Sequence, residues 1–168
     1  MSIIKEVLKN AELQPFLADS CQENDICVEI DNRIEKENFI IIKVDRYYNS
    51  LHEEVPPSPD CLIIQTCDQN KFKISIVELK NIDSSKHLKT ENLIKKYETC
   101  LNDFISNSFK DILYKDYSVI KLYFISHIEK RDYGLKISTI MNKRFSYKNK
   151  KYMIELQTPG FRIKPCYK

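Results

Sequence analysis

The spacing of hydrophobic residues predicts two helices. In residues 2–10 the apolar side chains recur three or four positions apart, as on one face of a helix. Residues 90–109 show the clearest stripe of this kind, and Thr90 is placed to cap its start. The stripe consists of Leu93, Ile94, Tyr97, Leu101, Phe104 and Ile105.

Shorter apolar runs predict strands. They are residues 26–30, 38–48, 61–66, 71–80, 118–128, 135–141 and 151–156. The polar residues 67–70 are a plausible turn, so the two runs on either side of them are expected to form a hairpin. Residues 49–59 are excluded from a central strand because their three prolines lack N–H donors. Residues 118–128 are apolar at nearly every position, which is typical of a strand covered on both faces.

The order of these elements predicts the fold class. A helix, antiparallel strands, a crossover helix, a central strand and further strands indicate a mixed α/β fold with a central sheet flanked by helices. A chain of 168 residues is long enough to build a substantial core, and we expect a single domain over residues 1–168. With 42% hydrophobic and 30% charged residues, the composition is that of a globular protein rather than a disordered one.

Composition argues against several classes of protein. Neither of the two glycines lies in a phosphate-cradling pattern, so we expect no nucleotide cofactor. No stretch approaches the roughly 20 apolar residues that a membrane span needs, so we expect no membrane partner. The charged residues 1–10 lack the apolar core of a signal peptide, which favours a cytoplasmic location. In that compartment the six cysteines are expected to be reduced, with neither disulfides nor zinc, because the C-x5-C spacings do not suit a zinc site.

The charge is unevenly distributed, although its net value is only +3. Residues 1–60 carry 6 Lys/Arg against 13 Asp/Glu, whereas residues 61–168 carry 21 against 11. A basic half favours a polyanionic partner. The acidic half is either a metal-binding edge or a solvated face.

Three ionisable residues stand in or beside the two strands of the predicted hairpin. Asp60 immediately precedes the first strand, and Glu78 and Lys80 lie inside the second. Side chains alternate along a strand, so Glu78 and Lys80 point to one face, and pairing of the strands brings Asp60 near them. Two neighbouring carboxylates favour a divalent cation such as Mg²⁺, with Mn²⁺ able to substitute. A lysine beside them is suited to orienting a metal-bound water or to stabilising charge on a phosphate.

Pro59-Asp60, followed by Glu78-Leu79-Lys80, resembles the motif of the PD-(D/E)xK nuclease superfamily. That group includes many restriction endonucleases and the archaeal junction resolvases. The resemblance spans about residues 38–128 and implies a restriction-endonuclease-like core. It implies that Asp60 and Glu78 are metal ligands, together with the main-chain carbonyl of Leu79, and that Lys80 is the catalytic lysine. The alternative is an ordinary Glu–Lys pair on a solvated strand face, next to a loop aspartate.

Further residues are weaker candidates. Many members of the superfamily add a glutamate from an N-terminal helix as a metal ligand, and Glu6 is the candidate here, with Glu12 behind it. The alternative for both is a solvated helix charge. The tyrosines of residues 44–50 either cap the sheet or line a substrate channel. Candidate contacts to nucleic acid are Lys86, His87, Lys89, Lys143, Arg144, Lys148, Lys150 and Lys151.

Two of these candidate groups have alternatives. A lone surface histidine such as His87 is often only a polar contact. Residues 147–152 are expected to form a basic hairpin, which either follows a nucleic-acid backbone or is an edge hairpin protected by its lysines.

The sequence therefore predicts a metal-dependent DNA endonuclease of restriction or defence type. By analogy with small enzymes that cut two strands, we expect a homodimer. One alternative is a nuclease that resembles the Holliday-junction resolvases or recognises another DNA structure. The other is a non-catalytic nucleic-acid-binding module on a nuclease fold.

Overall fold

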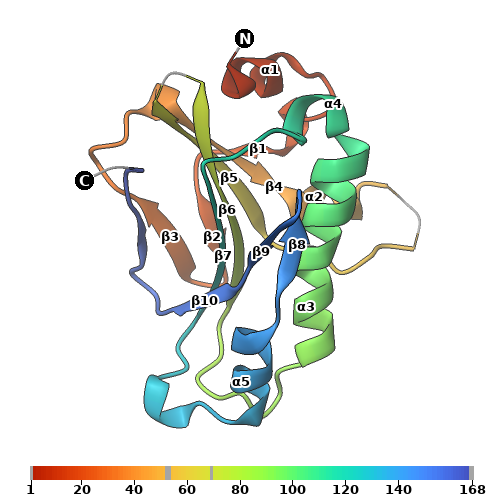
Figure 1. Cartoon of the computed structure of the whole chain (residues 1–168). Coiled ribbons are helices and arrows are strands. Elements are labelled where there is room, and N and C mark those ends of the chain that lie inside the picture. Colours follow the sequence, from red (N-terminus) through yellow and green to blue (C-terminus); the bar gives the residue numbers. More distant parts are fainter. Residues whose placement is uncertain (1, 52–53, 69, 167–168) are drawn as a thin grey trace.

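The computed structural model describes residues 2–51, 54–68 and 70–166 (Figure 1). Within these residues it is a mixed α/β fold whose central sheet is flanked by helices, as predicted. The central sheet has the strand order β1–β4–β5–β6–β7–β10. Its strands are β1 (Leu17–Ala18), β4 (Phe39–Lys43), β5 (Cys61–Asp68), β6 (Lys71–Lys80), β7 (Val119–Ser126) and β10 (Ile154–Gln157). A second sheet consists of β2 (Cys21–Glu23), β3 (Ile26–Ile30) and β11 (Arg162–Ile163). A third sheet consists of β8 (Phe145–Tyr147) and β9 (Lys150–Tyr152).

The pairing of the strands sets which residues meet at each end of the central sheet. Strands β4, β5 and β6 are antiparallel neighbours, and β7 runs parallel to β6. Lys43 lies opposite Cys61, and Cys61 lies opposite Val77. The end of β4, the start of β5 and the end of β6 therefore share one end of the sheet. Asp60 and Glu78 are both located there.

Helices cover one face of the central sheet (Figure 1). They are α1 (Ile3–Lys9), α2 (Val44–Asn49), α3 (Thr90–Glu98), the π-helix η3 (Thr99–Ser108), α4 (Lys110–Leu113) and α5 (Leu135–Asn142). Short 3-10 turns are η1 (Gln14–Phe16), η2 (Lys36–Asn38) and η4 (Lys130–Asp132). The helix predicted at 90–109 is confirmed as α3 and η3, but its N-cap is Lys89 and no side chain caps it. Among the described residues, no helix combines the length and the apolar character that crossing a membrane requires.

The opposite face of the sheet is covered by β2, β3 and β11. On β6, Ile76 belongs to the core on the helical side, whereas Val77 and Leu79 belong to the core on the other side. The central strands are thus buried on both faces, which explains their nearly continuous apolar runs.

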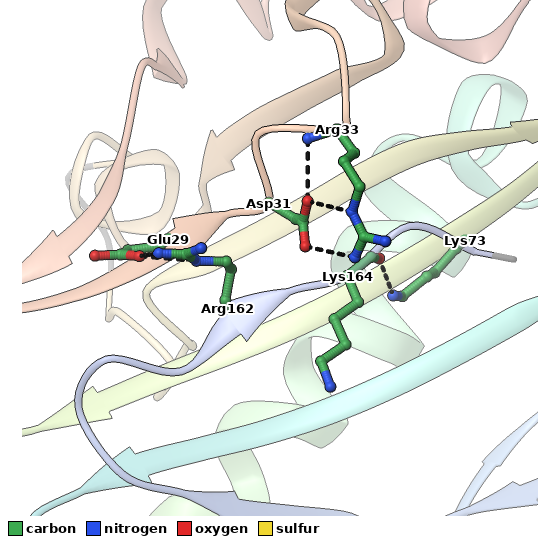
Figure 2. A network of polar contacts seen from close by, with 6 residues as sticks. All are labelled: Glu29, Asp31, Arg33, Lys73, Arg162 and Lys164. Atoms are coloured by element: carbon green, nitrogen blue, oxygen red, sulfur yellow. Dashed lines mark hydrogen bonds and ion pairs between the residues drawn. The ribbon is translucent and has the colours of Figure 1, made fainter. Parts of the chain in front are cut away.

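A polar network fastens this second layer to the central sheet (Figure 2). It consists of Glu29, Asp31, Arg33, Lys73, Arg162 and Lys164. Arg162 on β11 donates to Glu29 on β3 at 2.6 Å. The ammonium of Lys73, which is buried on β6, donates to the main-chain carbonyl of Lys164 at 3.1 Å. Residues 162–164 are therefore bound to the central sheet as well as to β3.

Two predicted strand segments are helical instead. Residues 44–48 belong to α2, where Val44 and Tyr48 are buried four positions apart, as helical periodicity requires. Residues 135–141 belong to α5, in which Ile137 and Ile140 are buried while Leu135 is 83% exposed. This burial follows a period of three rather than two. The β-branched residues of the segment favoured a strand by composition, but packing of one helical face prevailed.

The tyrosines of residues 44–50 are part of the core. Tyr47 contacts the rings of Phe16, Phe104 and Phe109, and Tyr48 is 2% exposed. The Tyr48 hydroxyl donates to a carboxylate oxygen of the π-helix. Of the two alternatives, packing on the sheet is the one that the structure supports.

The prediction of reduced cysteines is wrong for four of the six. Disulfides join Cys21 to Cys61 and Cys67 to Cys166, and Cys27 and Cys100 are free. The paired residues are 40 and 99 positions apart in the sequence, so the short C-x5-C spacings carried no information about them. They meet because the second layer lies on the central sheet.

Candidate functional site

The motif residues Asp60, Glu78, Leu79 and Lys80 line one pocket of about 250 Å³. The pocket lies at the end of the sheet where β6 ends. The other residues that line it are Glu23, Asn24, Asn81, Ile82 and Lys96. The structure thus brings together the residues that the sequence predicts to act together.

Backbone hydrogen bonds hold Asp60 in this pocket. Its carbonyl accepts from the N–H of Val44 at 3.1 Å, and its Oδ2 accepts from the N–H of Leu79 at 2.7 Å. The first bond ties Asp60 to the start of α2, and the second ties its carboxyl to the end of β6. Only 5% of the residue is exposed.

Burial strongly perturbs the carboxyl of Asp60. Burial, the nearby charge of Glu78 and a hydrogen bond with Glu23 together raise the pKa of Asp60 to about 9. The raised pKa favours the protonated form of Asp60, hydrogen-bonded with Glu23, at neutral pH. A divalent cation would relieve this arrangement by taking the place of the proton.

Glu78 is buried and forms an ion pair with Lys96. Its side chain is 3% exposed, and Oε1 accepts from the Nζ of Lys96 on α3 at 2.5 Å. Burial raises the pKa of Glu78, and the charges of Lys96 and Lys80 oppose that shift. The second oxygen, Oε2, is buried and has no hydrogen-bond partner among the described residues. Buried polar atoms usually have a partner, so this oxygen is a candidate to coordinate a cation.

A further pair of carboxylates adjoins Asp60. One oxygen each of Glu23, Asp45 and Asp60 lie within 4.8 Å of one another. Glu23 ends β2, and Asp45 lies in the first turn of α2, 3.7 Å from the ammonium of Lys43. An all-oxygen set of ligands suits Mg²⁺ or Mn²⁺ rather than a metal that prefers nitrogen or sulfur. The oxygens of Glu23, Asp45 and Asp60 could therefore hold such a cation, whereas Glu78 of the motif is not part of this close cluster.

Three charged residues at this site were not predicted from the sequence: Glu23, Asp45 and Lys96. Asn24 and Asp25 form a two-residue turn with positive φ angles of 43° and 65°, and such a dipeptide predicts a hairpin directly after Glu23. Asp45 precedes the tyrosines of residues 44–50, and nothing in its local pattern marks it as part of the site. Lys96 adjoins the apolar stripe of its helix, but nothing in the sequence shows that it faces Glu78.

Glu6 is not brought to this site. It lies on α1 and forms an ion pair of 3.7 Å with Lys115. Ile4 of the same helix lines a cavity with Phe39, the first residue of β4, whereas the pocket adjoins the last residue of that strand. Glu6 is therefore at the opposite end of the sheet, where the alternative of a helix surface charge fits its position. Glu12 is exposed.

Lys86, His87 and Lys89 are exposed in the segment that connects β6 to α3. That segment begins directly after Lys80, so it adjoins the pocket. The main-chain carbonyl of Lys86 accepts from the ammonium of Lys136 at 2.8 Å, which fastens the segment to α5.

The predicted basic hairpin is confirmed as β8 and β9, with a turn at residues 148–149. Several of its cations have partners within the protein. Lys143 pairs with Glu98 at 3.0 Å, and Lys148 pairs with Asp116 at 3.1 Å. The other members of this group contact uncharged partners or are exposed. Arg144 contacts Met153, Lys151 donates to Ser146, and Lys150 is exposed.

Comparisons with family models, with curated proteins and with solved structures each found no match. The resemblance to the PD-(D/E)xK superfamily thus rests on the motif and on the arrangement of its residues.

Proposed function

We propose that this protein is a metal-dependent nuclease of the PD-(D/E)xK type, with a restriction-endonuclease-like core, that hydrolyses phosphodiester bonds in DNA. The observation that carries the proposal is the buried pair of Asp60 and Glu78. Only 5% of Asp60 is exposed, burial raises its pKa, and the Oε2 atom of Glu78 is buried without a partner among the described residues. Lys80 lines the same pocket. An ordinary surface Glu–Lys pair, which was the alternative, would leave both carboxyl groups in water.

The order of elements around the pocket supports the proposal. Strand β4, the loop that ends at Asp60, the β5–β6 hairpin, α3 and β7 follow one another as the resemblance implies. Strand β7 pairs with β6 in parallel, after the crossover through α3 and η3. The arrangement places the motif at the end of two central strands, where rigid backbone holds both carboxyls.

Each motif residue has a role in this proposal. Asp60, Glu78 and the Leu79 carbonyl would hold the cation, and Glu23 and Asp45, whose oxygens lie within 4.8 Å of Asp60, would be further ligands. The bound cation supplies a polarised water and neutralises charge on the phosphate. Lys80 would stabilise the charge that develops on the phosphate oxygens. In the reaction the water oxygen bonds to phosphorus and gives up a proton to solvent, the bond to the leaving oxygen breaks, and the leaving oxygen takes up a proton from solvent.

DNA is the proposed substrate, and the basic segment next to the pocket is the proposed contact to it. Lys86 and Lys89 are exposed beside the site and are suited to binding phosphates on either side of the scissile one. Restriction or defence use and a homodimeric state remain predictions from the resemblance and from analogy.

Cleavage of DNA tests the proposal. Purified protein is incubated with supercoiled plasmid and Mg²⁺ or Mn²⁺, alongside the Glu78→Gln and Lys80→Ala variants. We expect the wild type to nick or linearise the plasmid and both variants to lose at least about a hundredfold in rate. Lys110→Ala, which removes an exposed lysine of α4, is the matched control and should cut at the wild-type rate.

The range of substrates separates the alternatives. A wild type that is inert on duplex, branched and single-stranded DNA and on RNA would refute the enzymatic proposal. Cutting confined to branched DNA would identify a structure-specific nuclease. Tight binding without any cutting would identify a non-catalytic module.

A further inference from the structure

Lys96 contacts the carboxylate that the proposed cation needs. It reaches Glu78 from α3, a helix outside the predicted motif, and its Nζ lies 2.5 Å from Oε1. The two partners differ in freedom, because the Glu78 side chain is 3% exposed whereas that of Lys96 is 23% exposed. Glu78 is fixed inside the sheet, and the lysine, on its flexible four-carbon stem, is the partner able to move.

We propose that Lys96 is an exchangeable counterion: it neutralises Glu78 while the site lacks a cation, and it turns to the substrate phosphate when a divalent cation takes Glu78. This inference rests on the proposed function. It assigns Lys96 to the phosphate-binding machinery, although Lys96 lies outside the PD-(D/E)xK motif.

The geometry makes the lysine and the cation competitors. Mg²⁺ binds carboxylate oxygens at about 2.0–2.1 Å. With the ammonium already 2.5 Å from one oxygen of Glu78, a cation on the same carboxylate would bring two positive charges within a few ångströms. Their repulsion is strong in a buried site, so binding of one weakens binding of the other.

The pocket also offers the displaced lysine a second partner. Lys96 and Lys80 line the same pocket from different elements, α3 and β6. A phosphate bound there would receive one ammonium from each side in addition to the cation. The lysine therefore leaves one anion for another and stays within the pocket.

Direct binding of Mn²⁺ without DNA tests the exchange. Isothermal titration calorimetry is run on the wild type, on Lys96→Met, and on Lys95→Met as the matched control from the exposed side of the same helix. Methionine keeps the length of the side chain and removes its charge. We expect Lys96→Met to bind Mn²⁺ about tenfold more tightly, equivalent to about 1.4 kcal/mol, and Lys95→Met to match the wild type. At saturating Mn²⁺ the same Lys96→Met variant should cut DNA more slowly and bind it more weakly.

Opposite effects on the two measurements distinguish exchange from a purely structural role. If Lys96 only stabilised the site, its loss would weaken Mn²⁺ binding and cleavage together, and that result would overturn the inference. Lys96→Arg keeps the charge and can contact both oxygens of Glu78, so it should bind Mn²⁺ more weakly than the wild type. Lys96→Arg tests the exchange even if Lys96→Met folds poorly. If Lys96→Arg bound Mn²⁺ as tightly as the wild type or more tightly, that result would contradict the proposed exchange.

Glu78→Gln separates this inference from the proposed function. If that variant binds Mn²⁺ as the wild type does, the metal site itself is wrong. If it loses binding while Lys96→Met shows no gain, the metal site stands and the exchange of Lys96 is refuted.

Discussion

Replacing Asp60 by asparagine is expected to stabilise the metal-free protein at neutral pH. Asp60 is buried and has a pKa of about 9, so the folded protein holds it as an acid. Asparagine has the same shape as that acid. Its amide oxygen can accept from the Leu79 N–H, and its NH₂ group can donate to Glu23, as the protonated carboxyl does.

The size of the effect follows from proton linkage. In the unfolded chain the carboxyl has a pKa near 3.8 and is ionised at pH 7, whereas in the folded protein it is protonated. A raised folded-state pKa means that this contribution is most favourable below pH 3.8 and is lost as the pH rises toward 9. Over the roughly three pH units from 3.8 to 7, at about 1.36 kcal/mol per unit, the loss amounts to at most about 4 kcal/mol. Asparagine does not titrate and should recover most of this free energy of unfolding.

Urea unfolding of the metal-free protein at several pH values measures the effect. The difference in the free energy of unfolding between Asp60→Asn and the wild type should be near zero at pH 4 and should increase steadily to pH 7. Asp83→Asn, at an exposed loop position, is the control and should show no such growth. Saturating Mg²⁺ should reduce the advantage of Asp60→Asn, because only the wild type gains from binding. If Asp60→Asn is as stable as the wild type or less stable at pH 7, Asp60 is not held as an acid and the reasoning fails.

Three further predictions concern the same pocket and the core around it. A cation that binds Asp60 displaces its proton, so the affinity for Mn²⁺ should rise by up to about tenfold per pH unit toward pH 9. Calorimetry at several pH values measures this, and binding without proton release would contradict it. Replacing both Cys21 and Cys61 by serine should lower the free energy of unfolding by about 2–5 kcal/mol, measured by urea unfolding of the variant and of the wild type without reductant. Equal free energies of unfolding for the two proteins would mean that the disulfide adds nothing. Tyr97→Phe removes the hydroxyl that donates to the buried carbonyl of Tyr123 at 2.7 Å, so it should cost about 1–3 kcal/mol in the same assay, and an unchanged midpoint would argue against that bond.

Local patterns in the sequence predict the centre of the fold. Alternation along residues 71–80 correctly separates Glu78 from Leu79, because a strand covered on both faces must send neighbouring side chains to opposite layers. The turn after β5 correctly predicts the hairpin that carries Asp60 and Glu78 to one end of the sheet. Its residue 69 lies outside the described part of the chain.

Contacts between distant segments could not be predicted in the same way. Glu23 reaches Asp60 only because β2 and β3 fold back over the sheet, and Lys96 reaches Glu78 only because of how α3 lies on it. The same layer brings Cys21 to Cys61, a pairing that spacing along the chain does not indicate. Residues 135–141 form α5 instead of the predicted strand, because packing buries Ile137 and Ile140 on one helical face.

The carboxyl groups in and beside the pocket come from widely separated parts of the chain, at positions 23, 45, 60 and 78. No short fragment contains them all. A peptide of residues 61–80, the β5–β6 hairpin, would contain only Glu78 of these four. Contacts between remote segments form late and slowly in folding, since each must close a long loop first. The capacity to bind a cation should therefore be acquired in the last stage of folding, as the layers dock. The rate at which Mn²⁺ binding returns after dilution from denaturant would then report the completion of the native state.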